Sequence, residues 1–153
     1  MKIECFVCRK PLIEEWIDAM IDSDFEQQKF LQGEMEYTTS FEDLTQFEIS
    51  ILYQCSTGNS IDYTQSIAEL YAEVDASAGP WVMAVAENAV KALAALTIGD
   101  GLISKWIEKT NHFTQEGEAK HANVLTAAAA ERLRQLCSIA VDKEADVFIC
   151  FYE

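Results

Sequence analysis

The distribution of charge constrains the fold of this 153-residue chain more than any other feature of its sequence. Residues 11–90 contain sixteen acidic residues and one basic residue, Lys29, so this stretch alone carries the whole formal charge of −15. The other residues hold ten acids and ten bases, which cancel. Burying an unpaired carboxylate is costly. We therefore expect most of the sixteen acids to lie on the outer surface of the elements that residues 11–90 form.

The length and composition favour a single globular domain over residues 1–153 with no linker. Half of the residues are apolar and 24% are charged, which is ordinary globular composition. The first residues lack the long apolar run of a secretory signal. The longest apolar region, residues 81–98, is interrupted by Glu87, Asn88 and Lys91, which argues against a membrane span. Five cysteines without an export signal indicate reduced thiols, so we expect a cytoplasmic protein.

The hydrophobic patterns predict an α+β fold: a three- or four-stranded, mainly antiparallel sheet packed against five to six helices as a single pair of layers. Alternating or continuous apolar runs predict strands at residues 2–8, 34–39, 47–54 and 147–152. We expect the two terminal strands to be central and a hairpin over residues 34–54 to lie toward an edge. Helical spacing predicts helices at residues 11–22, 23–31, 63–75, 80–98, 102–107 and 118–142.

The cysteines and histidines do not form a recognisable site. Cys5 and Cys8 have the spacing of a metal-ligand pair, but on a strand their thiols would point to opposite faces. We therefore expect core cysteines, and neither a metal nor a cofactor. His112 and His121 could in principle serve Cys55 or Cys137 as a base, yet no nucleophile motif surrounds either thiol, and we expect His121 on the surface. No catalytic residue is predicted.

The acidic stretch therefore carries the functional interpretation. A surface of this charge repels phosphate backbones and anionic membranes, so neither nucleic acid nor a membrane is an expected partner. Its natural complement is a basic protein. We expect a small binding protein rather than an enzyme, and most concretely an immunity protein that neutralises a basic, nuclease-type bacterial toxin.

The candidate interface combines acids with aromatic anchors in the middle of the acidic stretch. Its predicted residues are Glu34, Glu36, Tyr37, Glu42, Asp43, Glu48, Tyr53 and Asp62. Two alternatives stay open: a nucleic-acid mimic that binds DNA-handling proteins, and a small enzyme with a pocket under the predicted helix 80–98.

Overall fold

The computed structural model describes residues 2–115 and 117–152 and contains five strands and seven helices in that part of the chain. The elements run in the order β1 (Lys2–Cys8), α1 (Lys10–Ile21), α2 (Phe25–Gly33), β2 (Tyr37–Glu42), α3 (Gln46–Thr57), β3 (Ala68–Glu73), β4 (Trp81–Val85), α4 (Glu87–Ala94), α5 (Asp100–Thr114), α6 (Glu118–Val124), α7 (Ala127–Asp142) and β5 (Asp146–Phe151).

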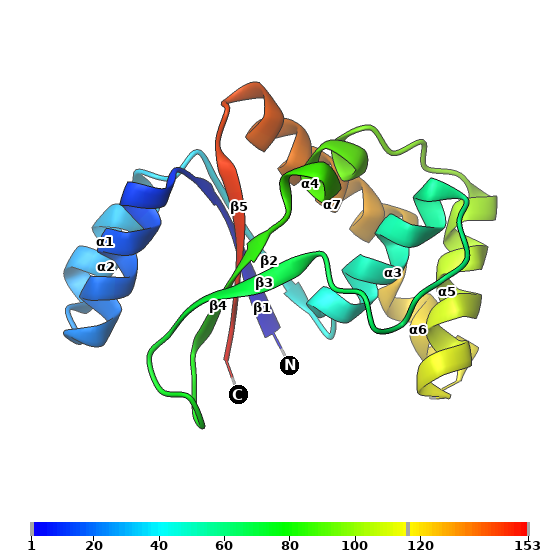
Figure 1. Cartoon of the computed structure of the whole chain (residues 1–153), viewed down its shortest axis with the longest axis horizontal. Coiled ribbons are helices and arrows are strands. Elements are labelled where there is room, and N and C mark those ends of the chain that lie inside the picture. The colour runs from blue at the N-terminus through cyan, green and yellow to red at the C-terminus, as the bar shows by residue number, and fades with distance from the viewer. Residues whose placement is uncertain (1, 116, 153) are drawn as a thin grey trace.

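The strands form one antiparallel sheet in the order β2-β1-β5-β4-β3. The sheet confirms the α+β class, the antiparallel pairing and the central place of the two terminal strands, since β1 and β5 both have neighbours on each side. It has five strands rather than three or four. The single pair of layers is wrong, because the helices cover both faces of the sheet (Figure 1).

One face of the sheet carries only the α1–α2 pair. Its core is built around Trp16 of α1, which is 1% exposed and lies with its ring centroid 4.9 Å from that of Phe6 on β1. Cys8, Val82 and Phe148 complete the strand side of this core. The α1 helix was predicted from the apolar spacing that includes Trp16, and the structure confirms it.

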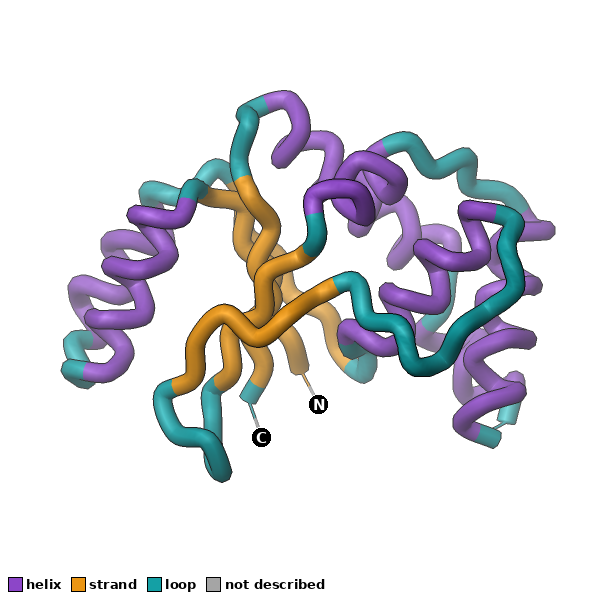
Figure 2. The backbone as a smooth tube through the Cα atoms, in the orientation of Figure 1, coloured by secondary structure: helices purple, strands orange, loops and turns teal. Residues whose placement is uncertain are grey.

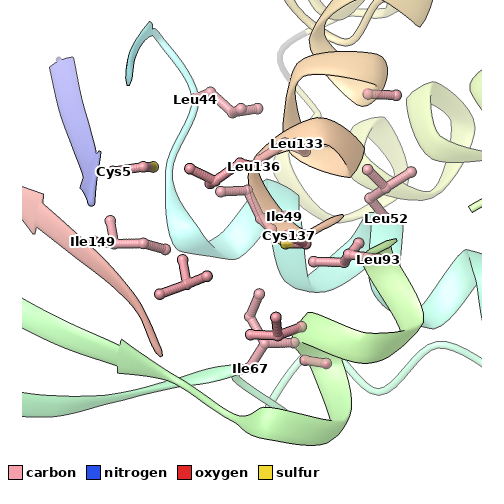
Figure 3. Close-up of a cluster of buried hydrophobic side chains, with 14 of the residues drawn as sticks. Cys5, Leu44, Ile49, Leu52, Ile67, Leu93, Leu133, Leu136, Cys137 and Ile149 are labelled. Atoms are coloured by element: carbon pink, nitrogen blue, oxygen red, sulfur yellow. The ribbon is translucent and has the colours of Figure 1, made fainter. Parts of the chain in front are cut away.

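The opposite face carries the larger core, between the sheet and helices α3 to α7 (Figures 1 and 3). Cys5 and Ile149 reach into it from the sheet, and Leu93 and Leu136 meet them from α4 and α7. Trp106 of α5 is fully buried and donates its indole N–H to the carbonyl of Glu48 at 2.8 Å. The Trp106 hydrogen bond holds α5 against α3, at the right of Figure 1.

The predicted strand at 47–54 is wrong: residues 46–57 form helix α3. Helix α3 is buried on several sides, including at the polar Ser50 and Gln54, so its apolar residues do not mark a single helical face. Their alternation therefore resembled that of a strand. Ser50 satisfies the buried N–H of Ile67 at 3.1 Å, and Gln54 pairs with the backbone of Asp62. The 34–54 hairpin is therefore wrong as well, because β2 pairs with β1 instead.

The predicted helix at 63–75 is wrong as well, and the predicted helix at 80–98 is wrong in part. Residues 68–73 form β3, and 81–85 form β4, its antiparallel neighbour. The register shifts at Tyr71, so the alternation of β3 is broken and the apolar residues imitate helical spacing. Only residues 87–94 of the second segment are helical, as α4.

Three further boundaries differ from the sequence prediction, and the first is the helix predicted at 102–107, which runs over 100–114 as α5. The second strand lies at 37–42 rather than 34–39, and the long helix predicted at 118–142 is divided into α6 and α7 around Leu125 and Thr126. The Thr126 side chain caps α7 by accepting from the N–H of Ala129 at 3.1 Å. Within the described part of the chain, no helix combines the length and apolarity that crossing a membrane would require.

Candidate protein-binding surface

The α1–α2 hairpin projects from one side of the molecule, and α2 is its outer helix (Figures 1 and 2). Helix α2 packs mainly on α1 and buries only Leu31. Its start is fixed by Asp24, whose carboxylate accepts from the N–H of Gln27 at 3.1 Å. A helix of nine residues is marginal on its own, so the contact with α1 holds it in place.

Large apolar side chains are exposed on this hairpin. Phe25 is 72% exposed, Phe30 62% and Ile21 54%. Phe25 and Phe30 are five positions apart on α2 and lie on either side of Leu31 around the helix, so one packing contact cannot cover all three. Exposed aromatic residues that gather on one element are typical of a surface that binds another protein.

Several of the sixteen acids in residues 11–90 have structural roles. Glu48 accepts from the N–H of Thr45 at 2.8 Å and from its hydroxyl, which caps α3. Asp62 and Asp75 each accept hydrogen bonds within their own turns, and this lowers the pKa of both carboxyl groups. Glu14 accepts from the hydroxyl of Tyr71 at 2.7 Å. With the cap residue Asp24 and with Glu87, which pairs with Lys91 at 3.0 Å, these acids are explained by the fold.

Apart from Asp43, the other acids are exposed and serve no such purpose among the described residues. Nine of them form no hydrogen bond or ion pair through the carboxylate there: Glu15, Asp18, Asp22, Glu26, Glu34, Glu36, Glu42, Glu69 and Glu73. Six of these nine fall between residues 15 and 36, on the α1–α2 hairpin and the turn that leaves it. The hairpin therefore combines the exposed aromatic residues with the densest group of carboxylates that the fold does not use.

The structure separates the interface residues that the sequence predicted. Glu34 and Glu36 lie at the end of the hairpin, whereas Glu42 and Asp43 lie at the far end of β2, next to the start of β1. Tyr37 and Tyr53 are half-buried and pack on the core of the opposite face. Glu48 and Asp62 belong to α3 and the loop after it. Of the predicted set, the structure brings Glu34 and Glu36 to the hairpin surface.

Sequence reasoning missed Phe25, Phe30 and Ile21. For Phe25 and Phe30, the signal is the poor amphipathicity of residues 25–33, where the apolar residues do not follow the i, i+3, i+4 pattern of a packed helix. In a short helix such a pattern leaves aromatic side chains in water, and that is what the structure has. Ile21 follows the same apolar spacing as the buried Ile17 of α1, so this signal does not find it.

The five cysteines are buried, as predicted, and Cys5 and Cys8 face opposite cores. Burial raises the pKa of Cys8, Cys137 and Cys150 to about 12 and that of Cys5 further, so these thiols stay protonated at neutral pH. Among the described residues, no three His, Cys, Asp or Glu side chains converge on a common point that could hold a metal ion.

The position of His121 differs from expectation. His112 lies on α5, and His121 is only 6% exposed, so its predicted surface position is wrong. It is buried because α6 packs its side chain against α5, where its Nε2 lies 3.2 Å from the hydroxyl of Thr114. Directly between Leu93 and the sheet the enclosed space is about 10 Å³, whereas cavities of about 440 and 600 Å³ lie along other sides of the 80–98 segment, next to Val90 and Lys91 and next to Leu96.

Comparison with known proteins does not place the chain in a family: no protein-family model, curated protein or solved structure matches it. The function is therefore argued from the surface itself.

Proposed function

We propose that this protein is a binding protein that docks a basic partner protein on its α1–α2 hairpin. The observation that carries the proposal is the combination of Phe25 and Phe30, both more than 60% exposed, with six unpaired carboxylates between residues 15 and 36. Interfaces commonly bury aromatic anchors at their centre and surround them with charged groups that select the partner. Neither feature is needed for the packing of the sheet.

The most concrete form of this proposal is an immunity protein that blocks a nuclease-type toxin. A nuclease binds phosphate through basic residues, so its active site attracts a carboxylate-rich surface. Complementary charge also accelerates association, which benefits an inhibitor that must act before the toxin does. A capture experiment that recovers a DNA-handling protein without nuclease activity would instead favour the nucleic-acid mimic.

The test uses the intact protein as bait for partners from the cells that produce it. The expected result is capture of a basic protein at about 50 mM NaCl and its release at about 0.5 M NaCl, because salt screens exposed charges. The double variant Phe25→Ala/Phe30→Ala should lose this partner. The matched control is Val141→Ala, since Val141 is also 46% exposed but lies on α7, on the opposite face of the sheet from the hairpin.

The immunity-protein hypothesis requires a second test, of nuclease inhibition. The captured protein should cleave nucleic acid, and adding the wild-type bait should stop the cleavage while the double variant does not. Capture that is insensitive to both salt and the double variant would contradict the proposed surface.

A further inference from the structure

A second surface lies across the sheet from the hairpin and has the opposite charge. Helix α5 presents Lys105, Lys109 and His112, which are spaced by four and three residues and therefore share one face of the helix. They line a cavity of about 390 Å³. Its other wall is the loop that follows α3, from Gly58 to Tyr63. In a chain with a formal charge of −15, such a cationic cavity is unexpected.

The loop wall is held in place by contacts on both sides. The hydroxyl of Tyr63 donates to the carbonyl of Lys109 at 3.0 Å, and its ring stacks on Phe113 with centroids 5.0 Å apart. The side chain of Gln54 bonds both the N–H and the carbonyl of Asp62, at 2.6 and 2.9 Å. Because this wall is already fixed, little conformational entropy is lost when a ligand binds to it.

A second cavity of about 600 Å³ continues along α5, and Lys105 lines both. Its walls include Cys55, Leu96 and Leu102, together with Thr57 and Thr97. Burial raises the pKa of the Cys55 thiol, so this side chain is a neutral wall rather than a nucleophile. Because the two cavities share Lys105 they adjoin, and we refer to them together as one groove with a cationic end and a more apolar end. Each cavity is of the size that small ligands occupy.

The acidic residues nearest the cationic end do not line the cavity, so its charged lining residues are the basic ones. Glu108 lies 3.9 Å from Lys109, but its side chain is 68% exposed and does not line the cavity. The carboxylate of Asp62 is held within its own loop by the hydroxyl and N–H of Thr64, at 2.7 and 3.0 Å. Lys105 is in no ion pair with another described side chain.

We propose that this groove binds a small organic phosphate. The phosphate lies among Lys105, Lys109 and His112, and the apolar body of the ligand lies against Leu96 and Leu102. Two ammonium groups and an imidazole match the double negative charge of a phosphate monoester better than the single charge of a carboxylate. Helix α5 and the loop after α3 lie on the far side of the sheet from α2, which carries Phe25 and Phe30 (Figure 1), so the site is independent of the proposed partner surface.

The test titrates the full-length protein with two probes, inorganic phosphate and phenyl phosphate, and follows amide chemical shifts. Both should shift the amides of Ser60 and His112, and phenyl phosphate should bind about tenfold more tightly because its ring enters the apolar end. The variants Lys105→Gln and Lys109→Gln should each weaken both probes about tenfold. The control Lys143→Gln, on the exposed end of α7, should change neither affinity.

Leu102→Ser separates the two ends of the groove: it should reduce the advantage of phenyl phosphate and leave the affinity for inorganic phosphate unchanged. The double variant Phe25→Ala/Phe30→Ala should bind both probes as the wild type does. The proposal is overturned if phenyl phosphate binds no more tightly than inorganic phosphate, or if Lys105→Gln binds both probes like the wild type.

Discussion

Replacing the two exposed phenylalanines of α2 should separate binding from stability. Full burial of a phenylalanine side chain contributes about 1.5–3 kcal/mol. Phe25 is 72% exposed and Phe30 62%, so they bury only about a quarter and a third of their surface. Phe25→Ala should therefore lower the free energy of unfolding by about 0.4–0.8 kcal/mol, and Phe30→Ala by about 1 kcal/mol or less. A hot-spot aromatic residue at an interface contributes about 2 kcal/mol or more to binding.

The assay is urea unfolding of the two variants beside Phe6→Ala, in which a fully buried side chain of the same type is removed. Phe6→Ala should cost about 3–5 kcal/mol because it leaves a cavity in the core under α1. If Phe25→Ala or Phe30→Ala cost as much as Phe6→Ala, the side chain would be part of the core in solution. The surface would then not be open to a partner, and the reasoning would be refuted.

Three further outcomes test the fold. Thr45→Ala removes the hydroxyl that accepts from the N–H of Phe47 at 3.2 Å and caps α3. Urea unfolding should show that the free energy of unfolding falls by about 1 kcal/mol. The control Ser60→Ala, in the exposed loop, should have almost no effect. Stability should fall as the pH rises above about 9, because the unfolded thiols ionise near the ordinary value of 9.0 while burial keeps those of Cys8, Cys137 and Cys150 protonated up to about 12. Each such thiol contributes a slope of up to about 1.4 kcal/mol per pH unit, and Cys137→Ala should make the measured slope shallower; an unchanged slope would place Cys137 in contact with water. The same burial predicts that iodoacetamide at pH 8 labels the native protein far more slowly than protein unfolded in urea, and equal rates would contradict it.

The elements whose burial follows a regular pattern were predictable from sequence. The apolar face of α1, with Ile13, Trp16 and Ile17, follows helical spacing because only one side of the helix meets the sheet. The terminal strands were predictable because their apolar runs are covered on both faces.

The middle of the chain was not predictable from periodicity, because burial there is nearly complete or the register is irregular. Helix α3 is enclosed by the sheet, α4 and α5, so its apolar residues do not follow a period of 3.6. The capping box from Thr45 to Glu48 was the local signal of its start. The five apolar residues of β4 are too few to separate a buried strand from a helix.

The candidate surface was predictable in its charge and not in its place. The excess of acids in residues 11–90 is visible in the sequence, but only the structure separates acids that cap helices or close turns from those that remain unused. Glu48 caps a helix and Asp62 closes a turn, whereas Asp18 and Asp22 have no such role among the described residues. The proposed interface therefore shifts from the middle of the acidic stretch toward its beginning.

Amide hydrogen exchange of the wild-type protein with and without its captured basic partner tests the central claim most directly. Docking on the hairpin predicts that slowed exchange on binding is concentrated in residues 15–36, since the partner would cover α2 and the outer side of α1. Amides of α5 and of the loop after α3 should exchange as before. Slowed exchange confined to residues 42–62 or to α5, with residues 15–36 unchanged, would contradict the account.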